Sequence, residues 1–504
     1  MREKYVFSFI SNTISYIFFI LSNYIMALRF APTLLGSWVF LNSVINLGFM
    51  FVSVGFDKIH YQYSSKTGEP YYYFGAYLLI KSVLLTSNII ISLIIISILN
   101  LWTSPYVVLL ILLLFSKTLF EFGLIFILNF RSNRKIFKAE IPFLFAYIVK
   151  SLIKVFVALN IENILEPLLN LVVLYIIFDC IYLIIILLLS RSQFSIHTPD
   201  KTIIISYIKD AKLLILLSVF SVIATNLGNI FLDYSLGHEI LSYFSLVYVY
   251  LIPALIKVSE SLFNVYLAHF SQFFQKNDNE SIKSSIYSLE RYSSILFLSL
   301  ILIVFMNGNY ILSKFLPAYT ESYPILLIMI FIPFLIGTSR PYMGQLISGK
   351  KQDMYAKIEI TTQCLIIFSI FMTIFFNFVV FGNPILDIFG YAFSQTIPWI
   401  IWAFLARFYS KKYFDIRSKK MVLWHSLIAV LTFFISLFVK EVVLGFVFES
   451  TFYINIISFF QNLLTFLALL WITKLIDKTD IKFFVQLLNY KNYLRSIREE
   501  FEEK

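Results

Sequence analysis

Two lysines stand one helical turn apart inside a stretch that is apolar enough to cross a lipid bilayer. The stretch is PFLFAYIVKSLIKVFVAL, residues 142–159, and the lysines are Lys150 and Lys154. A charge near the bilayer centre costs at least about 2.5–3.5 kcal/mol, so such a residue usually reaches the interface, pairs with an acid or faces water. This segment has no acid at helical spacing from either lysine. Two ammonium groups in such a place are suited to binding an anion.

Two other lysines have an acid on the same helical face. Lys117 lies four residues before Glu121, and Lys257 lies three residues before Glu260. Residues at these spacings are neighbours on a helix surface, so each couple can neutralise itself. Either a structural ion pair or a functional one fits the pattern.

Arg340 and Lys81 complete the basic residues of the apolar segments. Arg340 lies in IGTSRPYMGQ, where Pro341 and the flanking glycines are expected to loosen a helix. A broken helix that lines a cavity is a setting in which a membrane tolerates arginine, and this favours a functional role. Lys81 lies close to one end of its segment, so its long side chain is expected to reach the headgroups.

The composition shows what must position these charges. The chain has 504 residues, of which 59% are hydrophobic and only 14% charged. Soluble domains are about 45–50% apolar and about 25% charged, so the excess predicts an all-α, polytopic membrane protein. The net charge of +11 must then be placed relative to a membrane and does not indicate a nucleic-acid partner.

Apolar segments of spanning length recur along the whole chain. A transmembrane helix needs about 20 such residues, because about 1.5 Å of rise per residue must cover about 30 Å of hydrocarbon. The fourteen predicted spans are 7–28, 34–56, 74–99, 105–128, 140–160, 167–190, 203–232, 240–268, 286–306, 324–348, 355–381, 387–406, 421–439 and 453–473.

The distribution of basic residues between the loops predicts the orientation. If the N-terminus is inside, the inner loops hold most of the 40 Lys and Arg residues, and the outer loops hold only Arg29, Lys314 and Lys440. Cytoplasmic loops carry this excess, so both termini of a multi-pass protein of the plasma (inner) membrane are expected in the cytoplasm. All outer loops are short, so there is no outer domain to hold an active site and no catalytic residue is assigned.

The topology separates the two lysines of the opening stretch. Lys154 lies about five residues from the outer end and is expected to reach the outer surface, whereas Lys150 lies near the midplane. Asp179 is at a similar depth in the next span, within LVVLYIIFDCIYLIIILLLS. It either pairs with Lys150 or takes up a proton or a sodium ion.

Known cofactor and metal patterns do not occur. The chain has no GxxxxGK[ST] phosphate loop, and Cys180 and Cys364 form neither a CxxC pair nor a zinc pattern. The histidines are scattered, so neither a metal site nor a cofactor is expected. A coupling ion, H⁺ or Na⁺, stays open.

The spans divide into two similar units and a C-terminal addition. Residues 1–195 and 196–415 are each predicted to form a six-helix bundle, and 416–504 to form two more transmembrane helices and a basic cytoplasmic tail. An even number of spans in each unit gives a parallel repeat. RSNRKIFKAEI after the fourth span is weakly echoed by SGKKQDMYAKIEI after the tenth.

Three segments resemble one known group of transporters. They are LLGSWVFLNSVINLGF, SGKKQDMYAKIEI and NFVVFGNPILDIFGYAFSQTIPWIIW, and in them Gly36, Gly390 and Ala392 match the expected small residues. At the start of the eighth span, Leu241 and Ser242 stand before Tyr243, where a glycine is expected. The chain thus resembles the Wzx-type polysaccharide (O-antigen) flippases of the multidrug/oligosaccharidyl-lipid/polysaccharide (MOP) exporter superfamily. The resemblance implies two bundles around a central cavity and alternating access.

Together these patterns indicate a transporter rather than an enzyme. The expected substrate is a polyprenyl-diphosphate-linked oligosaccharide, whose charged headgroup cannot cross hydrocarbon unaided. The expected cavity cations are Lys150, Lys154, Arg340, Lys117 and Lys257, and the acids for ion coupling or charge pairing are Asp179, Glu121 and Glu260. Membrane lipids, a polysaccharide polymerase and glycosyltransferases are the expected partners.

Two alternatives remain at this stage. One is a multidrug cation antiporter of the same superfamily, which is expected to have acids rather than bases in its cavity and only twelve spans. The other is an integral-membrane glycosyltransferase or polysaccharide polymerase, which is expected to need a large outer loop.

Overall fold

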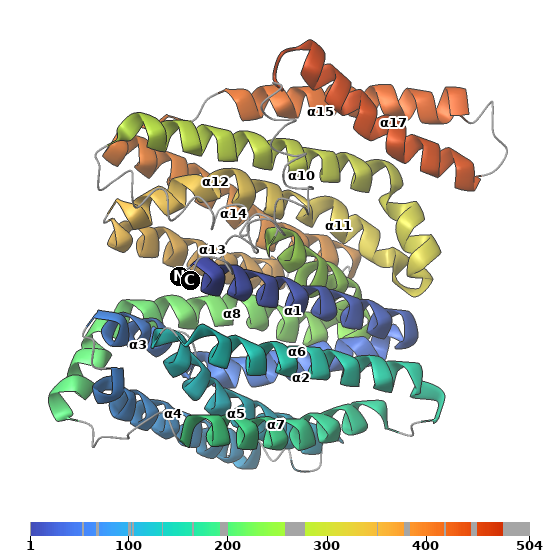
Figure 1. The fold of residues 1–504 in the computed structure, drawn as a ribbon. Coiled ribbons are helices and arrows are strands. Elements are labelled where there is room, and N and C mark those ends of the chain that lie inside the picture. The colour runs from blue at the N-terminus through green and yellow to red at the C-terminus, as the bar shows by residue number, and fades with distance from the viewer. Residues whose placement is uncertain are drawn as a thin grey trace. The chain divides into compact units, whose positions relative to one another are not determined.

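The computed structural model describes most of the chain. It covers residues 2–52, 55–66, 70–98, 102, 105–133, 135–163, 166–191, 200–257, 278–349, 351–376, 384–417, 420–444 and 451–476. Within these ranges the regular elements are all helical, as the sequence predicts, and their order along the chain can be followed in Figure 1. The residues up to Ser242 form one compact unit, and those from Tyr243 on form a second.

The first unit contains eight of the described α-helices. They are α1 (Arg2–Arg29), α2 (Pro32–Gly48), α3 (Gly55–Lys66), α4 (Pro70–Ile98), α5 (Pro105–Ser132), α6 (Ile136–Leu159), α7 (Pro167–Arg191) and most of α8 (Lys201–Ser245). Proline begins α2, α4, α5 and α7, where its missing N–H has no intrahelical partner to lose. Within this unit α1 packs along α6, and α5 along α7.

The second unit holds the rest of the described helices. After the π-helical turn η4 (Leu246–Leu251) come α10 (Asn279–Phe315), α11 (Tyr323–Met329), α12 (Phe331–Ser348), α13 (Gln352–Phe376), α14 (Pro384–Phe414), α15 (Met421–Phe438) and α17 (Thr451–Ile472). Helices α12 and α14 pack together and against α10 or α13. The last two helices, α15 and α17, pack against each other and on α10, as Figure 1 shows.

The helices match the predicted spans closely. Twelve described segments are long and apolar enough to cross a membrane, and Lys201–Lys257 covers the seventh predicted span and the part of the eighth up to residue 257. Within α1 the shorter segment Ile14–Arg29 corresponds to the first span. The predicted boundary after residue 195 is not tested, although α8 lies in the first compact unit up to Ser242.

One predicted irregularity lies elsewhere than expected. Helix α12 continues without a break through Pro341, and the chain instead turns at Ile330, between α11 and α12. The expected loosening around Arg340 is therefore wrong. Proline removes one backbone donor but need not break a helix that is packed on several sides, and the residues around Pro341 are buried.

Candidate functional site

Lys150 and Asp179 form an ion pair between neighbouring helices. Lys150 on α6 places Nζ 2.7 Å from Oδ1 of Asp179 on α7, and Asp179 is fully buried. The hydroxyl of Ser116 on α5 donates to the other carboxylate oxygen at 2.6 Å. The Lys150 ammonium also lies 3.9 Å from the ring centroid of Phe120. Of the two predicted alternatives for Asp179, the structure shows the pairing with Lys150.

Lys154 points inward to α1 rather than to the outer surface. Its Nζ donates to Oδ1 of Asn23 at 3.0 Å and lies 5.2 Å from the ring centroid of Phe19. The expectation that Lys154 reaches the outer headgroups is therefore wrong, because a polar partner on the packed face of α1 is closer. The Asn23 amide nitrogen donates in turn to the Phe19 carbonyl of its own helix at 2.8 Å.

Lys117 is held by an asparagine and not by the acid on its own helix. Its ammonium donates to Oδ1 of Asn46 on α2 and lies 4.9 Å from the ring centroid of Phe49. No ion pair within 4 Å joins Lys117 to Glu121 in the described structure, so the two charges do not meet in a direct contact. Glu121 nevertheless remains an electrostatic neighbour of Lys117.

Lys81 is buried, which the sequence did not predict. Only 2% of its side chain is exposed, and its ammonium lies 2.7 Å from Oδ1 of Asp57 on α3 and donates to the carbonyl of Val52 at 2.6 Å. The hydroxyl of Tyr77 donates to the same carboxylate oxygen at 2.7 Å. Snorkelling is therefore wrong for this residue. Asp57 was missed because it falls at the end of a predicted span, where an acid needs no explanation.

Glu121 connects these separate contacts into one group. It interacts electrostatically with Lys81, Lys117, Asp57 and Lys150, and Lys150 interacts with Lys154. We call the following residues the N-terminal charge cluster: Asp57, Lys81, Lys117, Glu121, Lys150, Lys154 and Asp179. With all groups ionised, four lysines face three acids, so the cluster carries an excess positive charge.

The cluster divides its lysines into two kinds. Lys81 and Lys150 each contact a carboxylate, whereas Lys117 and Lys154 are held by the neutral amides Asn46 and Asn23. An ammonium group that has only an amide oxygen as its partner is under-compensated inside a membrane protein. Among the lysines of the cluster, Lys117 and Lys154 are therefore the two whose printed hydrogen-bond partner is an amide and not a carboxylate.

The remaining predicted cations belong to the second unit. Arg340 lies on α12 and is half-buried. Lys257 is described and half-buried, whereas Glu260 lies outside the described residues, so the pairing of 257 with 260 stays a prediction. No group of three or more metal-ligating side chains occurs among the described residues, and the described cysteines are free.

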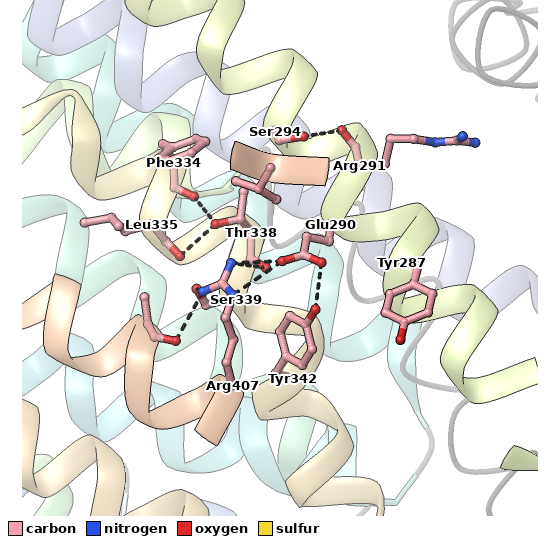
Figure 2. Close-up of polar contacts among 12 residues, drawn as sticks. Tyr287, Glu290, Arg291, Ser294, Phe334, Leu335, Thr338, Ser339, Tyr342 and Arg407 are labelled. Atoms are coloured by element: carbon pink, nitrogen blue, oxygen red, sulfur yellow. Dashed lines mark hydrogen bonds and ion pairs between the residues drawn. The ribbon is translucent and has the colours of Figure 1, made fainter. Parts of the chain in front are cut away.

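An ion-pair network in the second unit was missed by the sequence analysis. Arg407 on α14 donates from Nη2 to Glu290 on α10 at 3.0 Å, and from Nη1 to the hydroxyl of Ser339 on α12. The hydroxyl of Tyr342 donates to the other Glu290 oxygen at 2.6 Å. Figure 2 shows the guanidinium between Ser339 and the carboxylate, and the contacts join three helices. The sequence prediction places Arg407 in the loop that follows the span 387–406. The only sequence signal for a buried role is that Arg407 lies directly after this span, apart from the other basic residues of the loop.

A second missed centre surrounds His60 on α3. Its ring stacks on Tyr77 with centroids 4.1 Å apart, and its nitrogens lie 2.9 Å from the Tyr207 hydroxyl and 3.1 Å from Oδ1 of Asn129. An imidazole protonated at Nε2 donates to Asn129 and accepts from Tyr207. Burial lowers the pKa of His60 from 6.5 to about 4, so the ring is neutral at pH 7.

The fold is that of membrane transporters. No family model matches the sequence, and no curated protein matches it either. A lipid II flippase, MurJ, in an inward closed conformation superposes with a TM-score of 0.66 at 14% identity, covering 92% of this chain and 97% of that one.

Two multidrug transporter structures show a similar likeness. An inward-facing MATE family transporter of the MOP superfamily gives a TM-score of 0.57 at 10% identity, over 80% of this chain and 98% of that one. An outward-facing MATE transporter of the MOP superfamily gives a TM-score of 0.57 at 12% identity, covering 81% of this chain and 96% of that one. At these identities the likeness shows the fold alone, which this chain shares with the MurJ and MATE structures.

Proposed function

We propose that the protein is a flippase that moves a polyprenyl-diphosphate-linked oligosaccharide to the outer leaflet of the plasma membrane by alternating access. In this proposal it is a Wzx-type transporter for surface polysaccharide such as O-antigen, coupled to H⁺ or Na⁺. Both termini lie in the cytoplasm. Glycosyltransferases assemble the substrate before it is moved, and a polymerase uses it afterwards. The transporter fold and the similarity to MurJ, a flippase of a lipid-linked substrate, support this reading.

One observation carries the choice of an anionic substrate. Lys117 and Lys154 lie within apolar helices and have amide oxygens, not carboxylates, as their hydrogen-bond partners. A diphosphate would supply the missing negative charge and would accept stronger, charge-assisted hydrogen bonds than an amide does. The cluster around them is positive in balance, which suits an anion and opposes a cation.

The alternative function is that of a multidrug cation antiporter of the same superfamily, and the similarity to the MATE structures supports considering it. A cation carrier needs an acid that is free to meet its substrate. Asp179 is fully buried and already engaged by Lys150 and Ser116. The charge balance of the cluster therefore favours the flippase.

The test replaces the two amide-held lysines together. Lys117→Gln with Lys154→Gln should abolish surface glycan in cells while the protein stays at its normal level in the membrane. The matched control is Lys314→Gln with Lys412→Gln, two exposed lysines outside the cluster; it should leave glycan unchanged. Normal glycan output from the cluster variant, or drug efflux by the purified protein without any effect on lipid-linked sugar, would refute the proposal.

A further inference from the structure

Helix α8 meets α2 and α3 through discrete polar contacts and through close approaches at Gly36 and Gly55. None of the closely packed helix pairs among the described residues includes α8. Side-chain hydrogen bonds join it to α2 and α3 at four points: Tyr207 with His60, Asp210 with Tyr63, Asn226 with Asn46, and Asn229 with Ser43. An element whose backbone approaches its neighbours at few positions separates at a lower free-energy cost than a densely packed one.

Asn46 takes part in this docking and in the N-terminal charge cluster. Its Oδ1 accepts from the ammonium of Lys117 on α5, and its Nδ2 donates to Oδ1 of Asn226 on α8 at 3.2 Å. Asn226 directs its own Nδ2 at the carbonyl of Val222, 2.8 Å away, and so turns its Oδ1, an acceptor, toward Asn46. The amide of Asn46 must therefore point its nitrogen at α8.

Lys117 is the group that fixes this orientation. An ammonium has only donors, so it holds the oxygen of Asn46 toward α5 and thereby turns the nitrogen toward α8. Without the ammonium, the amide is equally able to turn its oxygen to Asn226, where two acceptors would face each other. The contact between Asn46 and Asn226 on α8 thus depends on the ammonium of Lys117 remaining at Asn46.

We propose that Asn46 links the occupancy of Lys117 to the docking of α8. An anionic diphosphate that takes the ammonium of Lys117 releases Asn46, and the contact of α2 with Asn226 is lost. This inference rests on the proposed function, because it assumes that the anion reaches Lys117. It adds a positioning residue and a moving element that the charge pattern alone does not define.

The other lysines of the cluster lack such a link. Lys81 and Lys150 are bound to carboxylates, which an incoming anion would have to displace. Lys154 is held by Asn23, whose nitrogen donates to Phe19 within α1 and so reaches no second helix. Among the described residues, Asn46 is the amide that joins a cluster lysine to another helix through its second polar atom.

The backbone beyond these contacts permits α8 to move. Gly237 interrupts the helix with φ 84° and ψ 172°, and no atom lies within 4 Å of the position that a Cβ would occupy. A left-handed residue in open space acts as a joint rather than as a packed contact. The segment of α8 before Gly237 can therefore tilt without unwinding the residues that follow.

The experiment measures docking by disulfide trapping in the full-length protein. Ser43→Cys with Asn229→Cys, in a background with Cys180→Ser and Cys364→Ser, places two thiols where a 3.0 Å hydrogen bond now joins α2 to α8. Farnesyl diphosphate is the probe, and farnesol is its neutral control. We expect saturating farnesyl diphosphate to slow disulfide formation about three- to ten-fold, the effect of losing one net hydrogen bond, and farnesol to leave the rate unchanged.

Variants of the cluster separate the inference from the proposed function. Lys117→Met should abolish the effect of the probe on the trapping rate, whereas Lys154→Met should keep the full effect at saturation. Asn46→Asp gives Lys117 a carboxylate but removes the donor to Asn226, so it should trap the disulfide slowly without the probe and show no further slowing with it. This conservative variant tests the link even if Lys117→Met does not fold.

Calorimetry of probe binding shows whether a negative result contradicts only the role of Asn46 or also the proposed function. Binding without any change in trapping, or an unchanged response in Lys117→Met, would overturn the role of Asn46 and leave the proposed function standing. Absence of binding to the folded protein would overturn both.

Discussion

Lys150 on α6 and Asp179 on α7 lie with Nζ and Oδ1 2.7 Å apart, and 21% of the lysine side chain but none of the aspartate is exposed. A buried carboxylate of this kind stabilises the fold only while its counter-ion is present. The ion pair therefore connects α6 to α7, and the hydrogen bond from Ser116 connects α5 to the same carboxylate. This gives Asp179 a structural role that separates it from Lys117 and Lys154.

Breaking this pair on the lysine side should destabilise the protein. Lys150→Met leaves Asp179 buried without compensation, and we expect the free energy of unfolding to fall by about 3–5 kcal/mol. Thermal unfolding of the purified protein, followed by tryptophan fluorescence, measures the loss. Lys150→Met combined with Asp179→Leu should recover most of it, because no charge is then left buried. A double variant as unstable as the single one would argue against the pair as a lock.

Part of this site was predictable from the sequence. Hydropathy placed the helices, and depth within the spans brought Lys150 and Asp179 together as one of two alternatives. The partners of Lys117 and Lys154 were missed because Asn46 and Asn23 carry no charge and lie on other helices. A contact across two helices depends on how those helices pack, whereas a spacing along one helix does not.

The network of Arg407 was beyond a hydropathy argument for a related reason. Helix α14 extends past the predicted span 387–406, so Arg407 fell just outside it, and Glu290, near the start of the span 286–306, was given no role. The structure places both on helices that meet at α12. Apolar length predicts where a helix crosses a membrane but not where it ends.

Replacement of Arg407 should show how much this network stabilises the second unit. Arg407→Lys keeps a charge near Glu290 but loses the forked donors, including the hydrogen bond to Ser339. We expect a loss of about 1.5–3 kcal/mol in the free energy of unfolding. Arg407→Met should cost more, about 3–5 kcal/mol, since Glu290 is then buried and unpaired. Equal melting temperatures for the two variants would contradict this order.

Tyr342→Phe is the finer probe of the same network. It removes one hydrogen bond, of 2.6 Å, to the Glu290 carboxylate and leaves the ion pair with Arg407 intact. A hydrogen bond to a charged group contributes about 1.5–3 kcal/mol, so the melting temperature should fall by less than in Arg407→Met. Tyr287→Phe is the matched control. The hydroxyl of Tyr287 donates to the carbonyl of Arg417 in an exposed position, so its removal should have a small effect.

His60 should make the stability depend on pH. Its pKa is about 4 in the folded protein and 6.5 without burial, so the unfolded chain binds the proton more tightly. The contribution of the neutral ring is therefore complete above pH 6.5 and is lost as the pH falls toward 4, by about 3 kcal/mol in all. Melting temperatures at pH 7.5 and 4.5 should differ less in His60→Gln than in the wild type. The same pH dependence in both proteins would refute this assignment.

Gly36 should tolerate no side chain, because a Cβ there would lie 1.7 Å from the backbone oxygen of His238. Backbone atoms cannot turn away as a side chain can, so Gly36→Ala must displace α8 from α2. We expect a lower melting temperature and, in the Ser43→Cys/Asn229→Cys protein, slower disulfide formation even without an added ligand. Gly48→Ala is the control on the same helix, since its Cβ would meet only side-chain atoms, of Asn88 at 3.2 Å and of Ser92 at 3.8 Å, among the three nearest. If Gly36→Ala traps the disulfide as fast as Gly48→Ala, the close approach of α2 to α8 is not what positions the two helices.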